Sequence, residues 1–134
     1  MTYNDKINKT ETLNFESSPL TGGASLSYQN LYVLTSGNTA SASEIVINCL
    51  KPYMEGRLYQ VGAATFGKNV AQQLFTNAEA PGIELWLTTT YLSNSQGYYD
   101  YFKDGLLPDF EIEENYGAEL GDFGSAEDQL MQPV

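Results

Sequence analysis

The sequence contains no histidine, one cysteine and only six basic residues. Without an imidazole the chain cannot use Ser-His-Asp or Cys-His catalysis, and most zinc sites, which need a His or several Cys, are excluded as well. The single Cys49 rules out an internal disulfide. A nucleophilic reaction near neutral pH would therefore need a lysine, a carboxylate or a chain terminus as its base.

Positive charge is scarce: six basic residues stand against seventeen acidic ones, for a net charge of −11. Nucleic acids and anionic membrane surfaces are recognised through positive charge, so neither is expected as a partner. No apolar run reaches the ~18 residues of a membrane-spanning helix, and the N-terminus lacks the pattern of a signal peptide. The acidic residues of 111–128 have no calcium-binding spacing, so neither metal nor cofactor is expected.

The pattern of apolar residues predicts one domain of mixed α/β type. Residues 31–35, LYVLT, have the composition of a buried strand that enters a turn, and the apolar positions of about 41–53 have helical spacing. Residues 1–30 are expected to be irregular or edge structure. Further strands are expected at 57–62, in VAQQLFT, at 83–93 and around Phe110 and Ile112, and a short terminal helix is expected at 125–132 with Ser125 as its N-cap.

Ser41 opens the expected helix and has two interpretations. As a nucleophile it would lie beside helix N–H groups that have no intrahelical partner, including that of Ala42, which could hold a developing oxyanion. As a cap it would form a capping box with Glu44, three residues on. The local sequence leaves both interpretations open.

Lys68, in ATFGKNVAQQ, is the candidate base, because most other lysines lie in polar loops. A lysine that acts near pH 7 must have a pKa about 3 units below its ordinary value, which requires burial away from carboxylates. The amide of Gln72 could orient such an amine, but only if residues 68–72 form a helical turn, since in a strand they would be ~13 Å apart. The alternative is an ordinary surface lysine whose stem covers apolar neighbours.

Three segments in order, TASASEIVINCLKPY, GAATFGKNVAQQ and GLLPDFEIEE, resemble the core of the C-terminal processing peptidases, the tail-specific serine proteases of family S41. The versions from Bacteroidetes-type bacteria are the most similar. The resemblance implies a crotonase/ClpP-like α/β fold and a serine endopeptidase that works through an acyl-enzyme. It makes Ser41 the nucleophile, Lys68 the general base and Gln72 the residue that orients the lysine. The remaining site residues it implies are Ala42 for the oxyanion hole, with Thr65 and Glu44 in support.

The sequence also departs from the family pattern. Asn69 stands where relatives usually have glycine, and the PDZ domain and upstream oxyanion-donating segment of the family are not in these 134 residues. We therefore expect the C-terminal portion of a peptidase domain: a lead-in at 1–30, core motifs at 31–113 and an acidic tail at 114–134. The resemblance implies a polypeptide substrate and a periplasmic or cell-envelope location. The alternative is a catalytically incomplete remnant that acts as a binding or assembly module, for example as a homodimer joined at an exposed sheet edge.

Overall fold

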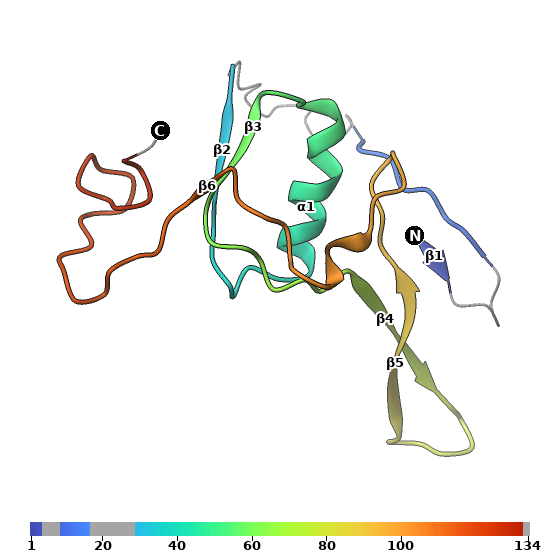
Figure 1. The fold of residues 1–134 in the computed structure, drawn as a ribbon. Coiled ribbons are helices and arrows are strands. Elements are labelled where there is room, and N and C mark those ends of the chain that lie inside the picture. Colours follow the sequence, from blue (N-terminus) through green and yellow to red (C-terminus); the bar gives the residue numbers. More distant parts are fainter. Residues whose placement is uncertain (4–8, 17–28, 133–134) are drawn as a thin grey trace.

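The computed structural model describes residues 1–3, 9–16 and 29–132, and it has two small sheets and one α-helix (Figure 1). Strands β2 (Leu31–Thr35), β3 (Leu58–Gly62) and β6 (Phe110–Glu111) form a parallel sheet in the order β2-β3-β6. Strands β1 (Thr2–Tyr3), β4 (Val70–Thr76) and β5 (Glu84–Tyr91) form an antiparallel sheet in the order β1-β5-β4. The other elements are the helix α1 (Ala42–Leu50) and the 3-10 turns η2 (Lys51–Tyr53) and η3 (Asp100–Phe102). The mixed α/β fold expected from the sequence is confirmed.

The helix α1 lies against one face of the parallel sheet, between that sheet and the N-terminal segment (Figure 1). Alternate residues of β2 explain this packing, because Leu31 and Val33 face the core while Tyr32 and Leu34 are exposed. Burial of these apolar side chains is the main force that holds helix and sheet together. The buried core they join is made of Ile47, Met54, Leu58, Tyr101 and Leu106.

Parallel pairing of β2 and β3 decides where the following loops begin. The register runs from Leu31 opposite Leu58 to Thr35 opposite Gly62, so both strands end at the same edge of the sheet. The turn after β2 leads to Ser41, and the loop after β3 leads to Lys68. Two segments far apart in sequence therefore leave the sheet side by side.

The hairpin of β4 and β5 extends away from the rest of the fold (Figure 1). Its strands pair from Val70 opposite Tyr91 to Thr76 opposite Glu84, with an irregularity between Ala71 and Gln72. Large apolar side chains lie exposed along it, with Trp86 at 60% exposure. The others at 40% or more are Leu74, Phe75, Leu85, Leu87 and Tyr91.

Most of the strands and the first helix expected from the sequence are present, whereas the expected terminal helix is not. The strands at 31–35, 57–62 and 83–93 are confirmed within a residue or two, and the helix ends at Leu50 before a 3-10 turn that contains Pro52. Proline has no N–H to continue an α-helical ladder, which accounts for this end. In the lead-in, β1 is an edge strand as expected, while residues 4–8 and 17–28 lie outside the described residues.

The terminal helix expected at 125–132 is absent, and the described part of the acidic tail consists of turns. Ser125 does accept a hydrogen bond from the Glu127 N–H at 3.2 Å. The buried carboxylate of Asp128, however, accepts the N–H groups of Gly124 at 2.9 Å and Leu130 at 3.0 Å. Local side-chain bonds of this kind compete with the helical ladder, and a helix this short has little stability of its own.

Within the described ranges 1–3, 9–16 and 29–132, no helix has the length and apolar character needed to cross a bilayer.

Candidate active site

Ser41 has an unusual backbone conformation at the point where the chain enters α1. Its φ is 56° and its ψ is −113°, and it is the one non-glycine residue of the described chain with a positive φ. A side chain in such a region costs of order 1–3 kcal/mol and persists only when the surroundings impose it. A serine on a strained strand-to-helix turn is also the arrangement that exposes the hydroxyl in a nucleophile elbow.

The capping interaction is present but does not explain this conformation. Glu44 accepts the Ser41 N–H on Oε2 at 2.7 Å. The reciprocal approach of the Glu44 N–H to the Ser41 side chain completes the capping box, although it falls short of full cap hydrogen-bond geometry. An ordinary N-cap residue lies in the β region and carries no strain. The backbone therefore favours a role for Ser41 beyond capping.

Glu44 is the most connected side chain near Ser41 and is completely buried, with 0% exposure. Its Oε1 accepts the Thr65 hydroxyl and the Gly67 N–H, each at 2.6 Å. Its Oε2 accepts the Ser41 N–H at 2.7 Å and the Lys68 N–H at 2.8 Å. One oxygen thus joins the backbones of both candidate catalytic residues, whose amide nitrogens lie at most about 5.5 Å apart, the sum of 2.7 Å and 2.8 Å.

The side chain of Lys68 is exposed, and in the described chain no hydrogen bond joins its amine to the Ser41 hydroxyl. Gln72 lies on β4 and is exposed as well. Residues 68–72 do not form the helical turn that a contact between Lys68 and Gln72 requires. The expectation that Gln72 orients the lysine is not met in this conformation, because an extended strand carries the amide away from residue 68.

Thr65, expected to support the site, is buried beside the lysine loop. Its hydroxyl donates to Glu44 Oε1 and accepts the Leu106 N–H at 2.7 Å. The backbones of Thr65 and Leu106 are also bonded, through a Thr65 N–H donated at 3.1 Å. Thr65 therefore fixes the start of the lysine loop to both Glu44 and the segment that follows η3.

Sequence reasoning missed two buried residues under the lysine loop. Asn69, which replaces the usual glycine, is 2% exposed and donates its side-chain amide to the Tyr99 carbonyl at 2.6 Å. Tyr101 is 1% exposed, and its hydroxyl has no partner among the described residues. Burial, with a smaller contribution from the charge of Glu44, raises the pKa of Tyr101 to about 12. Nothing in the local pattern GYYDYF separates this buried tyrosine from its exposed neighbours.

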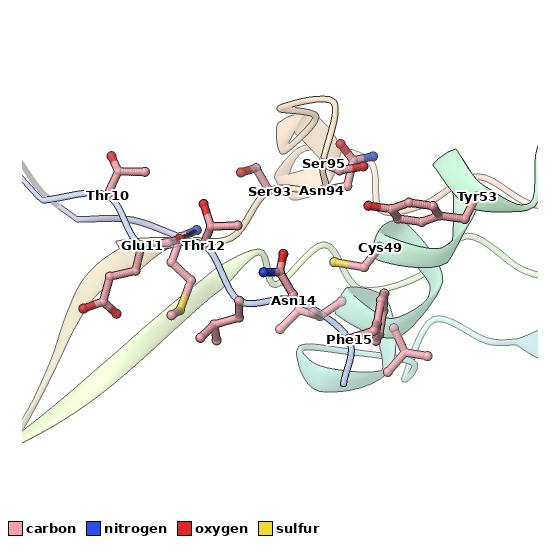
Figure 2. A pocket seen from close by; sticks show the side chains of 14 residues that line it. Thr10, Glu11, Thr12, Asn14, Phe15, Cys49, Tyr53, Ser93, Asn94 and Ser95 are labelled. Carbon is pink, nitrogen blue, oxygen red and sulfur yellow. Dashed lines mark hydrogen bonds between the residues drawn. The ribbon is translucent and has the colours of Figure 1, made fainter. Parts of the chain in front are cut away.

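A cleft of about 750 Å³ lies along α1, away from the serine turn (Figure 2). Figure 2 shows Cys49 and Tyr53 on the helix side and Asn14 and Phe15 on the side of the N-terminal segment. Neither Ser41 nor Lys68 lines it. Burial raises the pKa of the Cys49 thiol, which keeps it protonated and makes it a poor nucleophile at neutral pH.

Comparison with known proteins identifies the family to which this fold belongs. The family model described as peptidase family S41 matches residues 2–112. The chain belongs to this family.

Curated relatives include two carboxyl-terminal-processing proteases from cyanobacteria. The protein from Synechocystis sp. is 36% identical over 84 residues, which are 63% of this chain and 18% of the relative. The protein from Picosynechococcus sp. is 36% identical over 87 residues, which are 65% of this chain and 20% of the relative. The matched residues thus span about a fifth of these relatives' length.

Solved structures show the same relationship. An S41 protease structure from Bacteroides fragilis superposes with a TM-score of 0.78 at 32% identity, covering 98% of this chain and 33% of that chain. A photosystem II D1 C-terminal processing protease superposes with a TM-score of 0.50 at 31% identity, covering 62% of this chain and 20% of that chain. The fold is therefore that of part of an S41 protease.

Proposed function

We propose that this chain carries the nucleophile and the general base of a serine endopeptidase of the C-terminal processing type, acting on polypeptides in the periplasm or cell envelope. The observation that carries the proposal is the strained backbone of Ser41 at the start of α1. The proposal is supported by the backbone N–H groups of Ser41 and Lys68, which both donate to Glu44 Oε2. The curated relatives named carboxyl-terminal-processing proteases support the type of reaction.

In the proposed reaction the uncharged amine of Lys68 takes the proton of the Ser41 hydroxyl as Oγ attacks a peptide carbonyl carbon. The Ala42 N–H, at the first position of α1, stabilises the negative oxygen of the tetrahedral intermediate. Lys68 then gives the proton to the leaving amine, and the peptide C–N bond breaks to leave an acyl-enzyme ester on Ser41. Water, deprotonated by the same lysine, attacks the acyl carbon, the bond from that carbon to Oγ breaks to release the carboxylic acid, and Lys68 returns the proton to Oγ.

The proposal requires the Lys68 side chain to turn inward from its exposed position. The backbone of Lys68 is already anchored at its N–H, so only the flexible four-carbon stem has to reorient. Gln72 enters the proposal through the family resemblance alone.

A fluorophosphonate probe, which reacts with activated serines, tests the proposal. We expect labelling at Ser41, no labelling of Ser41→Ala, and a loss of at least tenfold in rate for Lys68→Ala. Lys103→Ala is the matched control, because Lys103 is an exposed lysine on a different loop. Absence of wild-type labelling at every pH up to about 10, where an ordinary lysine begins to lose its proton, would overturn the proposal.

A second candidate function, a non-catalytic assembly module, is favoured by the exposed apolar side chains of the β4–β5 hairpin. Under this alternative the hairpin would join two copies of the chain into a homodimer. Sedimentation velocity should then show a dimer that Trp86→Glu converts to a monomer. A wild-type protein that stays monomeric at all concentrations would exclude this form of assembly.

A further inference from the structure

The buried carboxylate of Glu44 is more than the first-turn acid of a capping box. All four of its partners are donors, so its two oxygens act only as acceptors, which is how an ionised carboxylate binds. A fully buried charge is costly unless hydrogen bonds replace its hydration, and here three backbone N–H groups and one hydroxyl do so. A helix cap alone would not require such burial.

Several other contacts of the lysine loop tie it to the segment that contains η3. Thr65 bonds to Leu106, and Asn69 bonds to the Tyr99 carbonyl. Gly67, with φ +91°, packs so closely that an added Cβ would lie 2.8 Å from the Tyr101 carbonyl oxygen. None of these contacts reaches the serine turn.

One further backbone bond does approach the turn, since the Phe66 N–H donates to the Thr39 carbonyl at 2.9 Å. It holds the preceding residues but leaves the Ser41 and Lys68 amides without a shared partner. Within the part of the chain that the structure describes, only Glu44 Oε2 provides that partner. This oxygen therefore joins the two segments at the proposed catalytic residues themselves, while the Phe66–Thr39 bond joins them two residues earlier in each segment.

We propose that Glu44 is a positioning residue that fixes the proposed nucleophile turn and the proposed base loop in one geometry. The part of this inference that concerns catalysis rests on the proposed function. The part that concerns structure is that the serine turn and the lysine loop are joined at Ser41 and Lys68 by the ionised Glu44 rather than by a direct contact between those two residues. Gln72, exposed on β4, does not provide this link.

Amide hydrogen exchange measured by NMR tests whether Glu44 joins the two segments, and it does not require an active enzyme. The Ser41, Gly67 and Lys68 amides donate to Glu44, so their protection reports on its carboxylate. In Glu44→Gln one acceptor oxygen becomes an NH₂ donor, and we expect exchange at these three amides to rise at least tenfold. Glu55→Gln, at an exposed glutamate, is the matched control and should leave them unchanged. Unchanged protection in Glu44→Gln would overturn the inference.

The rate of fluorophosphonate labelling tests whether Glu44 contributes to the reactivity of Ser41. We expect Glu44→Gln to lower the maximal inactivation rate at least tenfold, with little change in the probe concentration that gives half of it. A substitution that only weakened the fold would lower the melting temperature and leave that rate unchanged below it. Thr65→Ser should retain the rate and Thr65→Val should lose it, because only serine can still donate to Oε1.

The two failures can be distinguished. If the wild type is not labelled, the proposed function fails, and the exchange experiment still decides whether Glu44 links the two segments. If the wild type is labelled and Glu44→Gln reacts at the same rate, the inference fails while the proposed function stands. Should Glu44→Gln not fold, Thr65→Val takes its place in both experiments. We expect the Gly67 and Lys68 amides to lose protection in Thr65→Val. Unchanged protection of these amides would contradict the inference.

Discussion

Replacing Ser41 with glycine should stabilise the protein while removing the proposed nucleophile. The conformation of Ser41, φ 56° and ψ −113°, costs of order 1–3 kcal/mol for a residue with a Cβ and almost nothing for glycine. Against this gain stands the greater flexibility of glycine in the unfolded chain, worth about 0.5–1 kcal/mol, and a few tenths for the lost cap. We expect a net gain of about 1 kcal/mol, or about 3–5 °C in melting temperature for a domain of this size.

Urea unfolding followed by circular dichroism measures this gain, and fluorophosphonate labelling of the same variant should be lost. Ser43→Gly is the matched control, because Ser43 is two residues on in α1 with an ordinary helical backbone, and glycine there should cost about 0.5–1 kcal/mol. If Ser41→Gly is destabilised as much as Ser43→Gly, the serine turn stores no strain. The observation that carries the proposed function would then be lost.

The remaining predictions concern the packing beneath the site. Tyr101→Phe should raise the free energy of unfolding by about 1 kcal/mol, because it removes a buried hydroxyl that has no partner; a loss of stability in urea unfolding would show that the hydroxyl is satisfied. Because burial raises the pKa of Tyr101 to about 12, above the value of about 10 of an unfolded tyrosine, the free energy of unfolding falls as the pH rises from about 10 through 12 and is unaffected by this group below pH 10. The wild type should therefore lose roughly 2–3 kcal/mol relative to Tyr101→Phe over that interval in alkaline unfolding curves, and parallel curves would contradict the assignment. Gly105→Ala should cost at least about 2 kcal/mol more than Gly97→Ala, since both have positive φ but only at Gly105 would the new Cβ lie 2.0 Å from the Thr65 carbonyl oxygen. Equal melting temperatures for the two alanine variants would show that the loop can move aside.

Local patterns predicted the elements that depend on local physics. Runs of β-branched, aromatic and other apolar residues bounded by turn residues located β2 and β5, and the helical spacing of apolar residues located α1. The expectation failed at residues 125–132, where the Asp128 carboxylate forms local hydrogen bonds that no periodicity reports. The helical turn that a contact of Lys68 with Gln72 would need is not formed, since Gln72 lies on β4, which pairs with β5.

Some features of the site could likewise be predicted from the sequence, and others required the structure. The absence of histidine and the order of the three motifs were enough to select Ser41 and Lys68 as candidates and to name the family resemblance. The roles assigned to Ala42, Gln72 and Thr65 stay predictions until activity is measured. Apart from the supporting role that the resemblance implies, the sequence showed Glu44 only as a capping residue, because its other partners are more than twenty positions away.

By itself, therefore, the sequence determined which groups are available for chemistry: a serine at a helix start, a handful of lysines and no imidazole. The tertiary structure decided which of their backbones lie close together. Parallel pairing of β2 with β3 brings two distant loops to one edge of a sheet, and a single buried carboxylate oxygen then joins them. Such a meeting depends on strand register and on the burial of one charge, and both are properties of the folded chain rather than of any local stretch of residues.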